Sequence, residues 1–331
     1  MNKLTYILII PFLFSCSDND SSVLESNKIT THIEQKLNTN NKVTETSLII
    51  LGTIQDAGSP QIGCVKKCCK GLFQNPDNNR KVVSIGVIDP QNKKKYIFEA
   101  SPDFVSQTKL LKKYCDFETA ETPDGIFLTH AHIGHYTGLM YLGKEAMSAK
   151  NALVYAMPKM KIFLEENGPW SQLVKNNNIS INALEDNIPI QLTENLEIVP
   201  ITVPHRDEFS ETVGYVITGP NKSALFIPDI DKWGKWNTNI IEAISKVDYA
   251  FLDATFYDGE EINNRNISDI PHPFIIESME KFKGLSAEEK KKIYFIHFNH
   301  TNPVINIESK QAKQVIKNGF NIAQINTIFK L

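Results

Sequence analysis

The chain has 331 residues, of which 41% are hydrophobic and 22% are charged, and its formal net charge is −3 at pH 7. These fractions are typical of globular domains and exclude a chain that is disordered throughout. The slightly acidic balance also excludes a surface built to neutralise phosphate backbones, so we expect no nucleic-acid partner.

The N-terminal segment has the features of an export signal. Lys3 is followed by an apolar run at residues 4–14, which has the length of a secretory core and is too short to span a bilayer comfortably. The run ends in Leu-Phe-Ser-Cys, which resembles the bacterial lipobox. This resemblance implies cleavage before Cys16, a lipid on its sulfur, and an exported lipoprotein anchored to a membrane at the periplasmic face or the cell surface. An ordinary signal peptide with an incidental cysteine is the alternative.

A polar segment follows the predicted anchor. Residues 17–46 are rich in Ser, Asn, Asp, Glu, Lys and Thr and poor in large apolar residues, which is typical of a disordered tether. The sequence therefore predicts a signal peptide at 1–15, a lipidated Cys16 with its tether at 16–46, and a folded domain at 47–331. No internal repeat or second linker divides this last part, so we expect one domain.

From residue 47 onward, short β-branched runs bounded by Gly, Pro, Asn and Asp alternate with segments typical of helices. The predicted strands are 48–51, 82–88, 96–99, 126–128, 153–156, 196–203, 213–218, 224–227, 249–252 and 293–296. The predicted helices are 104–114, 137–149, 158–167, 240–246, 275–282 and 310–318. This alternation indicates an α/β fold.

Three histidines fall within six positions at the end of the predicted strand 126–128. His130 and His132 point to the same side of an extended segment, because side chains alternate along a strand, and they form a chelating pair. His135 follows at the turn into a helix and can reach the same cavity. Imidazole suits zinc, iron or manganese, and a catalytic site keeps one coordination position open for water.

Further candidate ligands follow later strands. His205 comes after the strand 196–203, Asp229 and Asp231 come after 224–227, and His297 closes 293–296. Taken singly, each is as readily explained as a polar residue where a strand meets solvent. Polar ligand types at successive strand ends together favour a metal site with the histidine cluster.

These residues carry a family resemblance that covers nearly the whole domain. The order of the histidine cluster, His205, Asp229 and His297 resembles the ligand motifs of the metallo-β-lactamase superfamily. Three further segments resemble the branch named for pyrroloquinoline quinone biosynthesis protein B: LGTIQDAGSPQ at 51–61, LDATF at 252–256 and HFNHTNP at 297–303. The resemblance implies an αββα sandwich, in which two mixed β-sheets pack face to face with helices outside and metals bind at one edge.

The resemblance also implies a ligand set, with one departure. His130, His132 and His205 would hold a first ion, Asp229 would bridge, and His135 and His297 would remain for a second. The superfamily commonly has Asp immediately before the third histidine of the first motif, where this chain has Gly134. The centre would then hold one or two divalent ions, zinc or alternatively iron or manganese.

A cysteine cluster lies near the start of the domain, at Cys64, Cys68 and Cys69. In an exported protein, two of these residues could form a disulfide and leave the third free. Related members of the superfamily bind a structural zinc with a cysteine-rich loop and a histidine three residues beyond the last catalytic one. His300 has this relation to His297. The alternatives are therefore a disulfide or a structural zinc site that contains His300.

The chemistry that fits best is hydrolysis of a small molecule, a phosphoester or a carboxylic ester or lactone, by metal-activated water. Asp229 would orient the water and accept its proton, and His300 becomes a candidate proton donor if the cysteines lie elsewhere. Asp56, Arg206 and Asp231 are candidates for contacts to the ligands or the substrate. The alternatives are an iron-dependent oxygenase, as the biosynthetic branch suggests, and a non-catalytic metal-binding lipoprotein.

Overall fold

The computed structural model describes residues 42–262 and 266–331. The predicted signal peptide, Cys16 and residues 17–41 lie outside the described residues. Lys42–Leu331 form one compact unit. We expected the folded part to begin at residue 47, and it begins five residues earlier. The reason is local: Val43 is buried, and its backbone N–H donates to the carbonyl of Tyr114 at 2.9 Å. The polar composition around this one apolar residue concealed its place in the domain.

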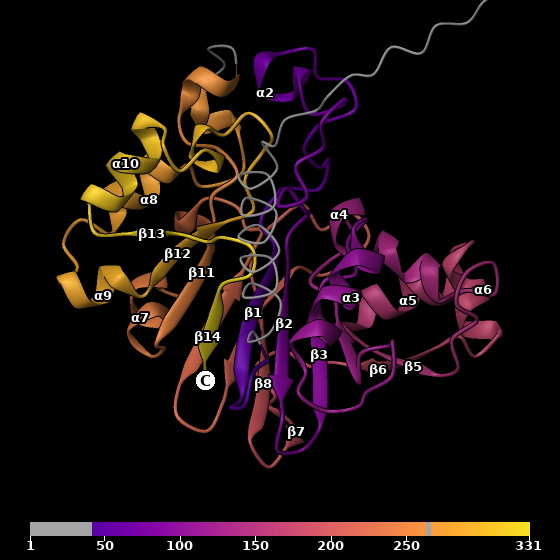
Figure 1. Ribbon diagram of the computed structural model, residues 1–331. Helices are drawn as coiled ribbons and strands as arrows, with labels where there is room; N and C mark the ends of the chain where they lie inside the picture. The colour runs from indigo at the N-terminus through magenta and orange to yellow at the C-terminus, as the bar shows by residue number, and fades with distance from the viewer. Residues whose placement is uncertain (1–41, 263–265) are drawn as a thin grey trace, which may run out of the picture. The chain divides into compact units, whose positions relative to one another are not determined.

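Two mixed sheets of seven strands each form the centre of the described unit (Figure 1). The first has the order β14 (Ile328–Lys330), β1 (Ser47–Gly52), β2 (Ser84–Asp89), β3 (Lys94–Phe98), β4 (Gly125–Phe127), β5 (Ala152–Ala156), β6 (Ile179–Ala183). The second has the order β13 (Asn321–Ile322), β12 (Ile293–Ile296), β11 (Tyr249–Asp253), β10 (Ser223–Ile227), β9 (Val213–Thr218), β8 (Leu196–Thr202), β7 (Ile190–Thr193). Pairing changes from antiparallel to parallel at β3 and at β10.

The space between the sheets is filled largely by aromatic and β-branched side chains. Phe98 stacks on Phe127 with ring centroids 4.7 Å apart, and the ring of Tyr215 from the other sheet meets Phe98 edge-on at 5.2 Å. The strands between this layer and the helices are covered on both faces, which explains why β1 and β2 are buried along their whole length. Their continuous apolar runs made these strands predictable from the sequence.

Helices cover the outer face of each sheet, which confirms the predicted αββα sandwich. The first sheet packs against α3 (Phe104–Tyr114), α5 (Pro158–Glu166) and α6 (Trp170–Lys175). The second packs against α7 (Ile240–Ser245), α8 (Ile275–Lys281) and α10 (Lys310–Lys317), and α9 (Ala287–Lys291) precedes β12. Helix α3 illustrates the pattern, because Phe104, Leu111 and Tyr114 form one buried face.

The helix predicted at 137–149 is wrong in most of its length. The chain forms a single turn α4 (Ile133–Tyr136), then the 3₁₀ helix η1 (Thr137–Leu142), and then turns. Gly138 explains the change: a Cβ there would lie 2.2 Å from the carbonyl oxygen of Ser101. The segment is pressed against the β3–α3 connection too closely for a regular helix, which the apolar periodicity does not reveal.

Several short elements escaped prediction because they lack a strong apolar pattern. They are the strands β6, β7, β13 and β14, the helices α2 (Lys67–Lys70), α6 and α9, and the 3₁₀ turns η2 (Trp233–Lys235), η3 (Gly259–Ile262), η4 (Ile267–Asp269) and η5 (Pro303–Ile305). Within the part of the chain that the structure describes, no helix has the length and apolar character needed to cross a bilayer.

Candidate metal centre

The predicted ligands lie where strands of both sheets end. His130 and His132 follow β4, His205 follows β8, Asp229 follows β10, and His297 directly follows β12. His135 is carried by α4, whose single turn begins immediately after His132. All six side chains belong to two groups of potential ligand atoms that share Asp229. All except His135 thus follow strands that are paired within the two sheets.

The first group consists of His130, His132, His205 and Asp229. His130 Nε2 lies 2.8 Å from His132 Nδ1, and Asp229 Oδ2 lies 3.4 Å from His130 Nε2 and 3.2 Å from His205 Nε2. Zinc bonds of about 2.0–2.1 Å in a tetrahedron put neighbouring ligand atoms roughly 3.3 Å apart. The observed spacing therefore fits one divalent ion.

The second group consists of Asp56, His135, Asp229 and His297. Asp56 Oδ1 lies 3.0 Å from His135 Nε2 and 3.2 Å from His297 Nε2, and Asp229 Oδ2 lies 3.9 Å from His135 Nε2. We expected Asp56 only as a contact to ligands or substrate, and the structure places its carboxylate between two of the predicted ligands.

A third group, Asp229 with Asp253 and His272, was missed in the sequence analysis. His272 Nδ1 lies 3.0 Å from Asp229 Oδ1 and 2.9 Å from Asp253 Oδ2. Asp253 ends β11 just as Asp229 follows β10, so its position at a strand end was an available signal. His272 lies in the long connection after β11, and no local pattern marks it.

Each predicted histidine ligand has an outer partner that fixes its ring. Among the pairs are His130 with Thr129, His132 with Glu208, His135 with Glu99, His205 with Asp231, and His297 with Thr255. These contacts span 2.9 to 3.3 Å between the ring nitrogen and the partner oxygen. Such partners orient imidazoles and raise their basicity in metal sites. Asp231 thus lies where we expected a residue that contacts a ligand.

Two residues of this shell have left-handed backbone conformations that are unusual for non-glycine residues. Glu99 has φ of 77° and His297 has φ of 67°, and both side chains are fully buried. Surrounding structure must hold such conformations in place, and they cluster at functional sites. Both conformations therefore agree with a functional role for this edge of the sandwich.

The electrostatics of the centre favour cations. Burial lowers the pKa of His130 well below its usual value. At Asp56, His135 and His297, burial acts against the pKa shift that the neighbouring charges cause. Despite burial, His135 and His297 hold the pKa of Asp56 well below its ordinary value, and Glu99 and Asp56 raise that of His135 well above. Asp229 raises the pKa of His297 to about 9. Protonated imidazoles here balance buried carboxylates, and metal binding would displace those protons.

The residues present therefore fit divalent metal ions. Three buried atoms in the described site make no well-aligned hydrogen bond and only approach a charged or ionisable neighbour: Glu99 Oε1 near His135, His205 Nε2 near Asp229, and Asp229 Oδ1 near His272. A buried polar atom without a well-aligned hydrogen bond costs free energy. His205 Nε2 and Asp229 Oδ1 belong to the converging ligand atoms, where a bound ion would give each a further partner.

The cysteine cluster forms a separate group of ligand atoms with His300. The Sγ atoms of Cys64 and Cys68 are 3.6 Å apart, which is too long for a disulfide, and all cysteines in the described residues are free. The backbone N–H of Gln61 points at Cys69 Sγ at 3.4 Å. Burial and Cys64 raise the pKa of Cys68 to about 12, so a nearby cation would favour its thiolate form. The disulfide alternative is thereby removed.

Two predicted positions lie away from the three groups that contain Asp229, which together we call the Asp229 centre. His300 belongs to the cysteine cluster and to none of the groups around Asp229, so our alternative of a proton donor beside the metals was misplaced. It lies three residues past His297, far enough along the chain to turn to the other group. Arg206 is 56% exposed and approaches Glu208 at 3.9 Å, so it lies at the rim.

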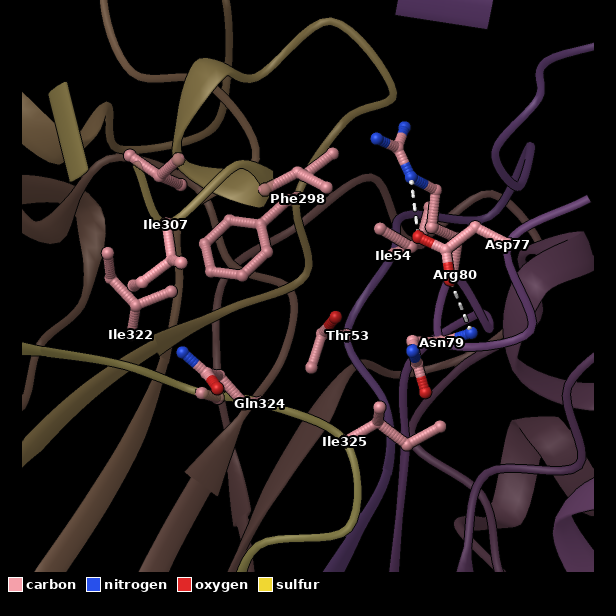
Figure 2. A pocket seen from close by; sticks show the side chains of 13 residues that line it. Thr53, Ile54, Asp77, Asn79, Arg80, Phe298, Ile307, Ile322, Gln324 and Ile325 are labelled. Carbon is pink, nitrogen blue, oxygen red and sulfur yellow. Dashed lines mark hydrogen bonds and ion pairs between the residues drawn. The ribbon is translucent and has the colours of Figure 1, made fainter. Parts of the chain in front are cut away.

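A cavity of about 320 Å³ lies beside the segments that carry Asp56 and His297 (Figure 2). Its walls come from the segments before Asp56 and after His297, with Thr53, Ile54 and Phe298 labelled, and from the C-terminal Ile322 to Ile325. Arg80 and Asp77 also line it and form an ion pair at 3.4 Å. None of the candidate ligands lines this cavity. It marks instead where the two segments that carry Asp56 and His297 run side by side.

A comparison with protein families identifies the fold. The family profile described as a β-lactamase superfamily domain matches residues 94–298, more than half of the chain. The chain belongs to this superfamily. The expected superfamily resemblance is thus confirmed, and the match covers the segments from β3 to the residue after His297.

Curated relatives carry the name of the expected branch, and solved structures share the fold. Coenzyme PQQ synthesis protein B of Gluconobacter oxydans (strain 621H) is 24% identical over 304 residues, 86% of this chain and 98% of the relative. The Zn(2+)-bound PqqB from Methylobacterium extorquens superposes with a TM-score of 0.71 at 19% identity, over 86% of this chain and 100% of that one. A diphosphatase from the PhnP family gives a TM-score of 0.60 at 20% identity, over 86% and 97%. At these identities the two structures support the fold.

Proposed function

We propose that this chain is a metal-dependent hydrolase that cleaves a phosphoester, or a carboxylic ester or lactone, of a small molecule. The observation that carries the proposal is the position of Asp229, which takes part in all three groups of ligand atoms around the strand ends. Membership of a superfamily that consists mostly of metallo-hydrolases supports the same reaction class.

His130, His132 and His205 would hold the first ion together with Asp229. A bound divalent ion supplies Lewis acidity and lowers the pKa of its bound water towards neutrality. Asp229 would orient that water and accept its proton. The remaining predicted ligands, His135 and His297, would serve a second ion.

His272 is suited to the opposite proton transfer. Burial disfavours its charged form, but Asp253 and Asp229 raise its pKa well above the ordinary value. Held between two carboxylates and 12% exposed, its ring can donate a proton to the leaving group of a substrate at the strand edge. We therefore propose His272 as the proton donor, a role for which the sequence had suggested His300.

The direct test is hydrolysis of a panel of small phosphodiesters, esters and lactones by the metal-loaded protein. Wild type should turn over at least one class, and Asp229→Asn should abolish the turnover. His272→Asn should spare substrates whose leaving group needs no proton, such as nitrophenyl esters, more than those with alkoxide leaving groups. Equal rates for wild type and Asp229→Asn across the panel would contradict the proposal.

The second candidate function is an iron-dependent oxygenase. The curated relatives named coenzyme PQQ synthesis protein B favour it, and imidazole with carboxylate ligands also suits iron. Metal content after aerobic and anaerobic purification separates the two. Iron bound only under anaerobic conditions, with oxygen consumption and no hydrolysis, would favour the oxygenase. Unchanged ligand binding after loss of His135 and His297 would instead favour a non-catalytic metal-binding lipoprotein.

We also propose that Cys64, Cys68, Cys69 and His300 hold a structural zinc. Four ligand atoms within 4.8 Å of one another, three of them thiols, support a closed zinc site. The ion would tie the loop after β1, including α2, to the segment after β12 (Figure 1). A zinc-to-protein ratio that falls by one when the cysteines are replaced would support this role.

Membrane anchoring through Cys16 is proposed on the sequence alone. Expression with the native N-terminus in a bacterium should give a mature chain that begins at a diacylated Cys16, in the membrane fraction. Mass spectrometry of the N-terminal peptide checks this. An unmodified N-terminus downstream of Cys16 would refute it.

A further inference from the structure

Gly134 leaves the second group of ligand atoms without the carboxylate that the resemblance leads one to expect before His135. The structure explains why no side chain can stand there. A Cβ on Gly134 would lie 2.5 Å from the Cα and 2.7 Å from the carboxyl carbon of Asp56. Because the first of these contacts involves the backbone of Asp56, rotation of its side chain could not relieve it. The loop that carries Asp56 therefore requires glycine at position 134.

The Asp56 loop is held against the segment that carries His297. The backbone N–H of Gln55 donates to the carbonyl of Phe298 at 2.9 Å, and the N–H of Phe298 donates to that of Thr53 at 2.8 Å. These two bonds lie just before Asp56 on one segment and just after His297 on the other. Figure 2 shows Thr53, Ile54 and Phe298 beside one another on the wall of the cavity. The position of Asp56 is thus set by the backbone.

The carboxylate of Asp56 points at the free nitrogens of both histidines. His135 and His297 engage Glu99 and Thr255 through Nδ1, so each presents Nε2 to the centre. Asp56 Oδ1 lies 3.0 and 3.2 Å from these two atoms. With the proposed function as its basis, we infer that Asp56 is a ligand of a second divalent ion, together with His135, His297 and Asp229. It supplies from another loop the carboxylate that Gly134 lacks.

The inference changes what the centre holds. Two imidazoles and a shared carboxylate alone would bind a second ion weakly, whereas a carboxylate from Asp56 completes a set of four protein ligand atoms. The centre is then binuclear, with Asp229 common to both groups. Asp56 also links the loop after β1 to metal binding, since this loop continues into the cysteine cluster.

Metal counting tests the inference without any substrate. Wild type, Asp56→Ala and Asp56→Asn are freed of metal, reloaded with zinc and assayed by inductively coupled plasma mass spectrometry and titration calorimetry. Removal of a residue that only orients a ligand costs about 10–100-fold in metal affinity. Asp56 is inferred to be a ligand itself, so its loss should weaken zinc binding at one site at least about a hundredfold, while the other sites keep their affinity. Asp77→Asn is the matched control, a carboxylate on the same loop that pairs with Arg80.

The result that would overturn the inference is an unchanged number and affinity of ions in both Asp56 variants. Gly134→Ala provides an independent variant, because its Cβ should displace the Asp56 backbone and lower the affinity for the same ion. Near-ultraviolet bands of cobalt bound to thiolate report the cysteine cluster separately, so its ion is not confused with the second one. Failure of hydrolysis in the wild type with two ions bound at the centre would refute the proposed function and leave this inference standing.

Discussion

The Asp229 centre and the cysteine cluster are both groups of potential ligand atoms, but the fold holds them in different ways. The Asp229 centre collects side chains from the ends of β4, β8, β10, β11 and β12, and most of these side chains are buried. The cysteine cluster belongs to a loop whose only regular element is the four-residue α2, and Cys64 and Cys68 are half-buried. The Asp229 centre is therefore held by the paired strands of the two sheets, whereas the cysteine cluster depends on local contacts within its loop.

This difference teaches which group depends on metal for its structure. The strands around Asp229 are held by the two packed sheets, so the centre should keep its geometry when metal is removed. The loop at 60–75 exposes apolar side chains, among them Ile62 and Val65, and buries little besides Cys69. Closed sites with thiolate ligands contribute folding energy directly. We therefore expect ligand loss to reduce chemistry at one group and stability at the other.

The largest effect should come from His130→Ala. The substitution removes a ligand from the first group, and we expect kcat/KM to fall roughly a thousandfold or more, about 4 kcal/mol of transition-state stabilisation. The melting temperature of the metal-free protein should change little, because the strand ends stay packed. Kinetics and calorimetry on the same preparations check both parts. A folded variant with wild-type activity would remove His130 from the centre.

Cys69→Ser should give the reverse pattern. Loss of one ligand from the cysteine cluster should release one ion and lower the melting temperature by about 5–10 °C, while activity at low temperature is largely kept. Cys115→Ser is the control, since Cys115 is a buried thiol outside the cluster. Thermal unfolding with parallel metal analysis checks the prediction. A Cys69 variant with unchanged metal content would show that the cluster does not bind one.

Glu261 contacts the segment that carries His297 and His300 and offers a pH test. Its carboxylate accepts a hydrogen bond from Thr301, next to His300, at 2.9 Å, and burial raises its pKa from 4.5 to about 7. The proton is held more tightly in the folded state, so the free energy of unfolding should fall as pH rises from 4.5 to 7. The largest possible change is about 3 kcal/mol.

Glu261→Gln should remove this part of the pH dependence and stabilise the fold above pH 7. Denaturant unfolding at pH 5, 6, 7 and 8 measures the slope, with the exposed neighbour Glu260→Gln as the control. A slope shared by wild type and Glu261→Gln would show that this carboxyl does not couple the segment to pH.

The sequence predicted the sandwich because its central strands are continuous apolar runs, such as β1 and β10, which need no partner to be recognised. The same property located most of the centre, since the histidine ligands and Asp229 come directly after such runs. Edge strands such as β13, with only two residues, carry no pattern of their own. Their formation depends on a neighbouring strand that the local sequence does not specify.

The parts of the site that escaped prediction are those made by contacts between loops. His272 reaches Asp229 from the connection after β11, and Glu99, whose backbone adopts a left-handed conformation, contacts His135. Asp56 was considered, but its position beside Gly134 follows from backbone hydrogen bonds to Phe298, 243 positions from Gln55 along the chain. No spacing rule brings such segments together before the fold is known.

The smallest effect should come from Glu208, the partner of His132. Glu208 Oε2 lies 3.2 Å from His132 Nε2, while His132 Nδ1 faces His130 at the centre. Loss of an outer partner costs about 10–100-fold in metal affinity or activity, and the partial exposure of Glu208 places Glu208→Gln near the lower limit. Glu211→Gln is the control, a carboxylate on the same connection that accepts instead from the backbone of Lys159. Competition with a chelator measures the affinity. An equal loss of metal affinity in both variants would show that the loss comes from a change in the loop. A loss confined to Glu208→Gln would show that a half-exposed carboxylate at the edge of the Asp229 centre orients His132.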